Sequence, residues 1–268
     1  MHDSRDRTQC LQQVLAESLE GDLTAGGFGV HYQPIVRLSD AAVIAVEALA
    51  RWSHVGLGEV QPKRFIGLAE STGLIDVIDQ FVLERACEDA EALALLYDRP
   101  VDVHVNVSAT RFGHGGIERA LDRVLHRGAL RPQQLVLEIT ETAQIDDVEA
   151  ACAVAQRIRE RGVRIALDDF GAGFSWLRRL HELPVDVLKL DSTVTHVESD
   201  KHMRSLCQVL VALGRSLGLE IVAEGIEDEQ QARALGQLGC GTGQGFLYGV
   251  PAPLVRFTPL LLPAVSSW

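Results

Sequence analysis

The sequence predicts an α/β fold in which parallel strands close into a barrel under a layer of helices. Segments that read as buried strands alternate with amphipathic helices along the 268 residues, and the connections between them are short. Each predicted strand has one uniformly apolar face and one mixed face that ends in a polar side chain. Side chains alternate between the two faces of a strand, so the apolar face can pack under helices while the mixed face lines the interior. This pattern is typical of a closed β/α barrel whose chemistry lies at the carboxyl ends of its strands.

The elements follow one another as this fold requires. Residues 1–25 are polar and helix-like, and we expect an N-terminal helical extension or a linker stub there. We expect one barrel over residues 26–262, because no Pro/Gly/Ser-rich linker divides it, and a short tail over residues 263–268. The predicted strands cover residues 43–49, 101–108, 134–141, 163–169, 185–191, 219–225 and 241–247. The predicted helices cover residues 76–97, 146–162, 200–218 and 228–239, and the last three begin at an Asp and end at a Gly.

Composition and charge exclude several classes of protein. The formal net charge is -12, which argues against a broad electrostatic contact with duplex nucleic acid. No apolar run is long enough to span a bilayer, and the first residues lack the apolar core of a signal peptide. The sequence therefore predicts a cytoplasmic protein without a membrane segment. The five cysteines are odd in number, lack a C-x-x-C pair and read as buried thiols of a reducing compartment: Cys10, Cys87, Cys152, Cys207 and Cys240.

Polar side chains end almost every predicted strand. They are Glu47, Asn106, Glu138, Glu141, Asp168, Asp169, Lys189, Asp191, Glu224 and Gln244. A buried carboxylate costs several kcal/mol unless it is paired or bound to a cation. Because Asp, Glu and Asn supply the oxygen ligands that hard cations prefer, the pattern predicts a site for one or two divalent cations. His104 lies on the same inward face, two residues before Asn106.

Structural explanations for the same residues stay open. The carboxylates could form ion pairs inside the barrel, although the basic partners on these strands are few, mainly Lys189 and Arg164. Lys189 could neutralise Asp191 or Glu224. Four further residues have their own alternatives: a turn role for Asn106, a backbone clamp for Gln244, and helix N-terminal acids for Glu141 and Glu227.

Nine ordered motifs between about Tyr32 and about Pro253 identify a resemblance. They are YQPIV, EALARW, FIGLAE, NVS, LEITE, DDFGAGFSWL, VDVLKLD, AEGIE and QGFLYG. The chain resembles the EAL-domain cyclic di-GMP phosphodiesterases over nearly its whole length. The resemblance implies a TIM-like (β/α)8 barrel in which one early strand runs antiparallel to the others. It also implies hydrolysis of one phosphodiester of cyclic di-GMP to linear 5′-pGpG, with two Mg²⁺ or Mn²⁺ ions as cofactors.

The family's functional residues carry over onto matching positions of this sequence. The implied metal ligands are Glu47, Asn106, Glu138, Asp168, Asp169 and Glu224, with Asp168 as the bridging carboxylate. The implied catalytic residues are Asp168, Glu224 and Lys189, and Lys189 would hold the attacking water. The implied substrate-binding residues are Gln33, Leu49, Gln244 and Arg51, of which Arg51 would meet a phosphate. Glu141 would anchor the loop after DDFG, and Glu227 and Asp191 would support the site from behind.

The resemblance and the residues together lead to expectations about partners. The main partner is cyclic di-GMP, and an upstream sensory domain or partner protein is a further expectation. The segment 171–181 combines glycines with Phe174 and Trp176, which predicts a homodimer through this loop and the helix after it. Alternatively, Trp176 packs on its own barrel. The loop departs from the family pattern at Ala172 and Trp176, and Ser192-Thr193 follows KLD.

Two other functions compete with the enzyme. One is a catalytically idle barrel that binds cyclic di-GMP or a protein partner and relays a signal. The other is a different Mg²⁺-dependent barrel phosphohydrolase. Degenerate members of the family usually lose ligand positions, whereas this chain keeps all of them, which favours the active phosphodiesterase.

Overall fold

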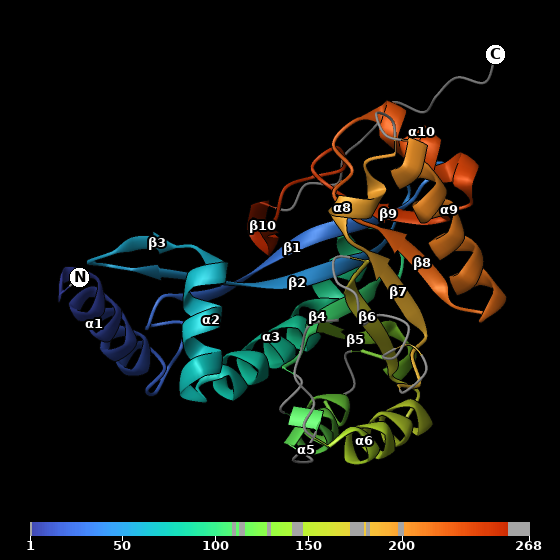
Figure 1. The fold of residues 1–268 in the computed structure, drawn as a ribbon. Coiled ribbons are helices and arrows are strands. Elements are labelled where there is room, and N and C mark those ends of the chain that lie inside the picture. Colours follow the sequence, from blue (N-terminus) through green and yellow to red (C-terminus); the bar gives the residue numbers. More distant parts are fainter. Residues whose placement is uncertain are drawn as a thin grey trace.

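A computed structural model describes the backbone of residues 2–108, 111–112, 116–127, 130–140, 147–171, 180, 183–197 and 201–256, and the side chains from Cys10 to Val255 in these ranges. Within these ranges, eight strands form a closed barrel with helices around it (Figure 1). The strands are β1 (Phe28–Arg37), β2 (Val43–His54), β4 (Asp102–Asn106), β5 (Leu135–Thr140), β6 (Arg164–Phe170), β7 (Val187–Leu190), β8 (Glu220–Ala223) and β9 (Thr242–Gln244).

The strand order confirms the TIM-like barrel with one antiparallel strand. Neighbouring strands pair in parallel from β2 through β4, β5, β6, β7 and β8 to β9. The first strand, β1, closes the ring by pairing antiparallel with β2 on one side and β9 on the other. Two short strands, β3 (Gly58–Val60) and β10 (Ala252–Pro253), extend this sheet at β2 and β1.

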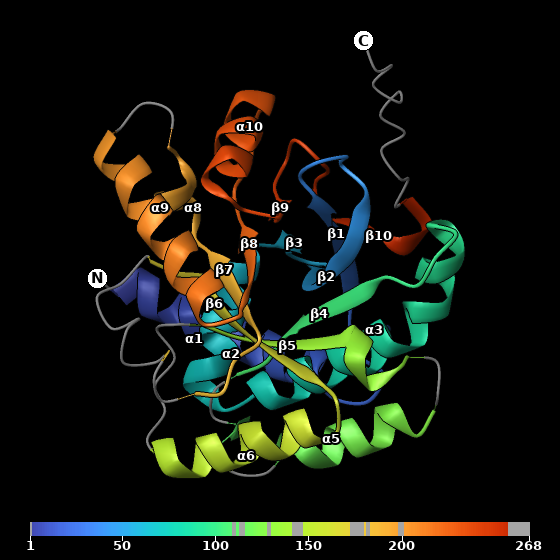
Figure 2. The same ribbon diagram turned by 90° about the vertical axis from the view of Figure 1, so that its right-hand side faces the viewer.

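The helices begin and end near the residues that the sequence indicates. The long helix is α3 (Ile75–Leu96), and α6 (Val148–Glu160), α9 (Lys201–Ser216) and α10 (Glu229–Leu238) lie between later strands. The remaining helices are α1 (His2–Ser18), α2 (Pro62–Thr72), α5 (Gly116–Leu125) and α8 (Ser192–Thr195), with short 3-10 turns at Pro132–Gln134 and Leu254–Arg256. Figure 2 shows α5 and α6 along one side of the barrel and α9 and α10 along another. Asp228 caps α10 and Gly239 ends it in the left-handed region, as predicted. The cap of α6 is Asp147, one residue later than the predicted start.

The two faces of the strands separate as the alternation predicts. The outward residues of β6, Ile165 and Leu167, belong to the main core beneath the helices. The inward residues form a second, smaller cluster inside the barrel, namely Ile35, Ala45, Val136, Ala166, Val187 and Val222. On every parallel strand of this cluster the next inward residue is two positions later in the chain, and on the antiparallel β1 it is two positions earlier. The small apolar cluster is therefore the floor on which a layer of polar side chains rests.

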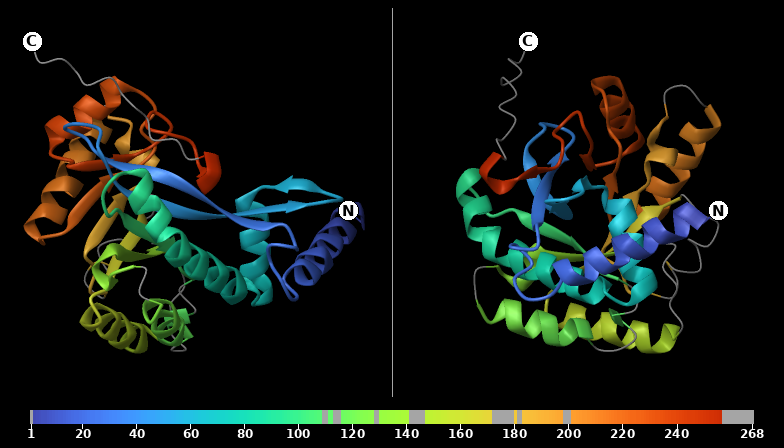
Figure 3. Two further views of the ribbon diagram at one scale, coloured as in Figure 1. Left: turned by 180° about the vertical axis from the view of Figure 1, so that it is seen from behind. Right: turned by 90° about the vertical axis from the view of Figure 1, so that its left-hand side faces the viewer.

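A second group of elements extends away from the barrel. Figure 3 shows α1, α2 and β3 together at one end of the molecule. Their core is aromatic, since Phe28 stacks on Trp52 with ring centroids 5.6 Å apart and Phe65 meets both rings edge-on. Leu11 and Leu15 of α1 are buried in the same continuous core. The domain boundaries at residues 26 and 262 stay a prediction. Among the described residues, no helix has the length and apolar character needed to cross a bilayer.

Candidate active site

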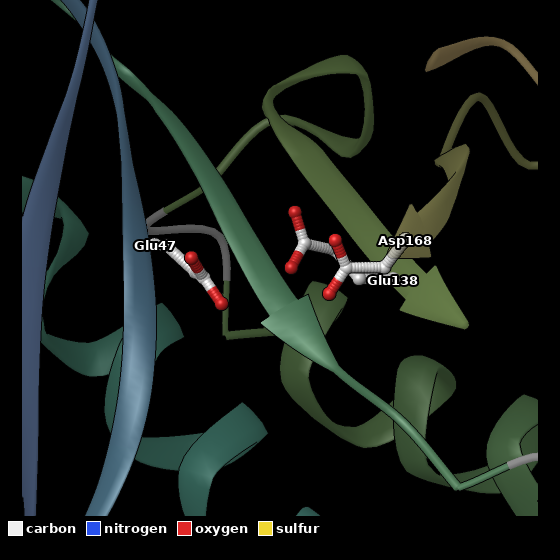
Figure 4. A group of neighbouring side chains, drawn as sticks. All are labelled: Glu47, Glu138 and Asp168. Carbon is white, nitrogen blue, oxygen red and sulfur yellow. The ribbon is translucent and has the colours of Figure 1, made fainter. Parts of the chain in front are cut away.

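Polar side chains form one layer above the floor of the barrel. They are Glu47 of β2, Asn106 of β4, Glu138 of β5, Asp168 of β6, Lys189 of β7, Glu224 directly after β8 and Gln244 of β9. Figure 4 shows the carboxylates of Glu47, Glu138 and Asp168 directed into the same space between their strands. Parallel strands that start at similar levels present their inward side chains at similar heights, so residues far apart in the sequence become neighbours.

Lys189 occupies the centre of this layer. Its side chain is 1% exposed, and its Nζ contacts four carboxylates: Glu138 Oε2 at 2.8 Å, Glu224 Oε1 at 2.9 Å, Asp168 Oδ1 at 3.1 Å and Glu47 Oε2 at 3.4 Å. Burial alone would lower the pKa of Lys189, but the surrounding carboxylates outweigh burial and hold it well above its usual value. Lys189 is therefore a charged ammonium at neutral pH.

The second basic residue considered from the sequence does not reach this layer. Arg164, at the start of β6, pairs with Asp102 Oδ2 at 2.5 Å and with Glu220 Oε2 at 3.1 Å. Asp102 and Glu220 begin β4 and β8, so this group lies at the amino ends of the strands, opposite the polar layer. Within the described residues, Lys189 is therefore the only lysine or arginine that pairs with Glu47, Glu138, Asp168 and Glu224.

The carboxylates outnumber the positive charge among them, and their pKa values reflect this. Burial, with Glu47 and Asp168 adding to it, raises the pKa of Glu138 well above its usual value in spite of Lys189. Burial and then Asp168 raise the pKa of Glu224 in the same way. The same two causes raise the pKa of Asp169 to about 6. Burial alone would also raise the pKa of Glu47, but the Lys189 ammonium and two amide hydrogen bonds outweigh burial and lower it.

The donor set fits divalent cations. Oxygens of Glu47, Glu138 and Asp168 lie within 4.8 Å of one another, and so do oxygens of Asp168, Asp169 and Glu224. The two groups share Asp168, as expected for a carboxylate between two ions. All of these ligand atoms are oxygens, which Mg²⁺ and Mn²⁺ prefer, and the excess negative charge is of the sign that a cation compensates.

Asp169 reaches this group because the backbone departs from regular strand geometry. Strict alternation would turn Asp169 away from Asp168, to the outer face of β6. Instead, the pairing with β7 shifts between Leu167 and Phe170, and Asp169 has φ +56°, in the left-handed region that residues other than glycine rarely adopt. A conformation of this kind costs about 1–3 kcal/mol and is typical of functional sites. The irregularity brings two adjacent carboxylates to one cluster.

Two amide side chains donate hydrogen bonds to Glu47, one to each of its carboxylate oxygens. Asn106 Nδ2 donates to Glu47 Oε1 at 2.8 Å, which leaves the amide oxygen as the ligand atom that Asn106 offers. Gln244 Nε2 donates to Glu47 Oε2 at 2.6 Å and to Gln33 Oε1 at 3.0 Å. Gln33 in turn donates to the carbonyl of Gly249 at 3.1 Å. The register of β1, which pairs Gln33 with Glu47 and Ile35 with Gln244, places these side chains together.

An open groove lies above the polar layer. Its volume is about 960 Å³, and it runs between the end of β2, α2, α3 and the ends of β4, β5 and β6. Leu49, Arg51, Asp168 and Asp169 are part of its lining, whereas Gln33 and Gln244 are buried beside Glu47. Arg51 is half-buried, and this burial lowers its pKa; an arginine nevertheless stays charged at neutral pH. The groove therefore combines oxygen ligands at its base with one cationic side chain, Arg51, in its wall.

Comparisons with known proteins agree with this geometry. The profile of the EAL domain matches residues 16–251. The chain belongs to the EAL domain family. A cyclic di-GMP phosphodiesterase, NbdA of Pseudomonas aeruginosa, is 37% identical over 95% of this chain and 32% of its own length. A bifunctional diguanylate cyclase/cyclic di-GMP phosphodiesterase of the same species, MucR, is 40% identical over 84% of this chain and 33% of its own length. The chain thus spans about a third of these two relatives.

Solved structures show the same fold. The phosphodiesterase PaMucR in complex with c-di-GMP has a TM-score of 0.80 and 38% identity, over 89% of this chain and 97% of that one. The EAL enzyme Bd1971, in a form with cAMP and cyclic-di-GMP bound, has a TM-score of 0.87 and 28% identity, over 95% of this chain and 69% of that one.

The EAL domain of this chain also contains two polar residues that the sequence analysis did not place in a role. His104, 4% exposed, contacts Glu138 Oε1 through Nδ1 at 2.7 Å, and burial followed by Lys189 lowers its pKa to about 4. Asp79 of α3 lines the groove and accepts from the backbone N–H of Ser108 at 2.8 Å. Burial raises the pKa of Asp79 to about 7. A sequence signal for Asp79 existed, since it stands on the apolar face of a helix among buried aliphatic residues.

Asp191 and Glu227, which were expected to support the site, are not part of the carboxylate cluster as described. Asp191 caps α8 by accepting from the N–H of Thr193. Lys189 pairs with Glu224, and the described residues show no ion pair between Lys189 and Asp191. Glu227 is exposed, and its backbone N–H donates to Gln231. Glu141 lies outside the described residues, as does most of the 171–181 segment predicted to form the dimer contact.

Proposed function

We propose that this EAL domain hydrolyses cyclic di-GMP to linear 5′-pGpG. Two clusters of three carboxylates share Asp168, and this arrangement carries the proposal. Asp168 and Arg51 both line the groove. Two relatives that are 37% and 40% identical are named as cyclic di-GMP phosphodiesterases, which supports the same substrate here. In the reaction, water adds its oxygen to one phosphorus atom, the bond from that phosphorus to a ribose 3′ oxygen breaks, and the 3′ oxygen takes a proton.

The proposed cofactors are two Mg²⁺ or Mn²⁺ ions. The residues that would hold them are Glu47, Asn106, Glu138, Asp168, Asp169 and Glu224. Such ions neutralise charge on the phosphoryl oxygens and lower the pKa of a bound water. The chain itself contributes the orientation of the ligands, because Asn106 and Gln244 hold both oxygens of Glu47.

The cationic side chains have separate tasks in this proposal. Lys189 is a compact ammonium at the centre of the layer, where it would hold the attacking water and favour its hydroxide form. Arg51 stands at the groove wall, where its planar guanidinium can pair with a substrate phosphate through two hydrogen bonds. Leu49 and Arg51 both line the groove, so they share the substrate-binding role, while Gln33 and Gln244 act through Glu47.

One experiment tests the proposal directly. The purified chain is incubated with cyclic di-GMP and Mg²⁺ or Mn²⁺, and the products are separated by chromatography. We expect 5′-pGpG, and we expect a chelator to stop its formation. Unchanged cyclic di-GMP together with measurable binding would instead support an idle barrel that binds the nucleotide. A homodimer through residues 171–181, an upstream sensory domain or partner protein, and a cytoplasmic location stay predictions from the sequence.

A further inference from the structure

The strand β4 contacts the carboxylates on both of its sides. It lies between β2 and β5 in the barrel. Its last inward residue, Asn106, donates to Glu47 of β2, and the inward residue before that, His104, contacts Glu138 of β5. His104 is 4% exposed and stands one layer below Asn106. Asn106 belongs to the proposed ligand set, whereas no role in the proposed reaction has been given to His104.

The two oxygens of Glu138 have different partners. Oε1 is 2.7 Å from His104 Nδ1, and Oε2 is 2.8 Å from Lys189 Nζ. Oε2 therefore shares the Lys189 ammonium with Asp168 and Glu47, whereas Oε1 is engaged by His104. A carboxylate that binds a cation can only accept hydrogen bonds, so the imidazole Nδ1–H donates to Oε1. This hydrogen bond holds the plane of the carboxylate and engages the oxygen that Lys189 does not contact.

We propose that His104 is a positioning residue that limits Glu138 to binding a divalent cation through one oxygen, and so favours Mg²⁺ and Mn²⁺ over Ca²⁺. The inference rests on the proposed function in so far as a cation binds at these carboxylates. Mg²⁺ requires near-octahedral coordination by single oxygens, whereas Ca²⁺ accepts six to eight ligands and often takes both oxygens of one carboxylate. A Glu138 that offers only Oε2 suits the smaller ions.

A purely structural role for His104 leads to a different expectation. The ring also fills space inside the barrel beside the small floor cluster, and its loss would then lower stability alone. In that case the affinity for different cations would change by a common factor or not at all. In the positioning role, the hydrogen-bond donor matters more than the ring, and its removal changes the preference between ions.

Two substitutions separate the roles. His104→Leu keeps much of the volume without the donor, and His104→Asn keeps an N–H donor close to the position of Nδ1. Free Mn²⁺ is measured by electron paramagnetic resonance during titration of the chain with MnCl₂, and CaCl₂ is then added as competitor. Loss of a hydrogen-bond partner behind a metal ligand typically weakens binding by about 10–100-fold. We expect His104→Leu to weaken Mn²⁺ binding by about that factor and Ca²⁺ binding by less, and His104→Asn to restore most of the parent's preference.

The outcomes distinguish this inference from the proposed function. A parent chain that binds no Mn²⁺ overturns both. A parent that binds Mn²⁺, with a His104→Leu variant whose Mn²⁺/Ca²⁺ preference is unchanged, overturns the positioning role and leaves the proposed function standing. A His104→Asn variant that behaves like His104→Leu overturns it as well. Thermal unfolding without metal shows whether each variant folds, and His104→Ala, which also lacks the donor, replaces His104→Leu should the latter not fold.

Discussion

Replacement of Lys189 by Met tests the charge balance of the site without creating a cavity. Met has a similar length and volume, so the main change is the loss of one buried ammonium among four carboxylates that lie 2.8–3.4 Å from it. An exposed ion pair contributes about 0–1 kcal/mol, but removal of one partner of a buried pair costs about 3–5 kcal/mol. Because Lys189 is 1% exposed, the larger range applies. For a domain of this size the melting temperature should fall by about 6–20 °C.

The loss of stability in Lys189→Met should depend on pH, and the pKa values of the neighbouring carboxyl groups decide in which direction. The pKa values of Glu138 and Glu224 are already raised, and Lys189 is the group that lowers them. Without Lys189 the pKa values of these two carboxyl groups in the folded state rise still further above their values in the unfolded state. Stability then falls as pH rises above the unfolded value near 4.5 towards the raised folded values. We therefore expect Lys189→Met to lose more free energy of unfolding at pH 8 than at pH 6.

The assay is urea unfolding followed by circular dichroism in EDTA at both pH values, with Lys201→Met as the control at an exposed position. In a parallel titration without EDTA, added Mn²⁺ should stabilise Lys189→Met more than the parent, because the variant offers a cation more uncompensated negative charge. A loss below about 1 kcal/mol, or a loss equal to that of Lys201→Met, would refute the reasoning. So would a loss that is the same at pH 6 and pH 8.

Three further predictions concern single residues. Asp168→Asn keeps the shape of the shared ligand but not its charge, so hydrolysis of cyclic di-GMP should fall by more than about 100-fold while circular dichroism stays unchanged; a variant within a few-fold of the parent would contradict the two-ion site. Arg51→Ala removes a side chain of the groove wall and should raise KM with little change in kcat, and the reverse pattern in steady-state kinetics would remove Arg51 from substrate binding. Asp79 has a pKa raised by burial from 3.8 to about 7, so the parent loses stability as pH rises across this window. Asp79→Asn can still accept the hydrogen bond from the N–H of Ser108. In denaturant unfolding, its free energy of unfolding should increase relative to that of the parent between pH 5 and pH 8. Equal pH profiles of the two proteins would contradict the buried charge.

The separation into helices, strands and faces could be predicted because it depends on local periodicity. A period of two in VRIALDD placed Ala166 and Asp168 on the inner face and Ile165 and Leu167 on the outer face, and the structure confirms this. The antiparallel course of β1 had no such local signal. Its direction is visible only in its pairing with β2 and β9, so it was expected from the resemblance alone.

The contacts within the site could be predicted less well. Alternation by itself turns Asp169 away from Asp168, and the irregular pairing of β6 with β7 reverses this. The sequence offered Asp191 and Glu224 as partners of Lys189, and the structure assigns Lys189 to four carboxylates that include Glu224 but not Asp191. The position of Asp79 on an apolar helix face was visible in the sequence, but its contact with the N–H of Ser108 was not, because Ser108 follows a different element.

The sequence by itself determined which residues face the interior of the barrel and that several of those at the strand ends are acidic, because side-chain direction along a strand is a local property of the backbone. It also determined the family, through motifs that keep their order along the chain. Only the tertiary structure decided which of these residues touch. The register between neighbouring strands depends on long-range packing. This register places Lys189 among the carboxylates and His104 one layer below Glu138.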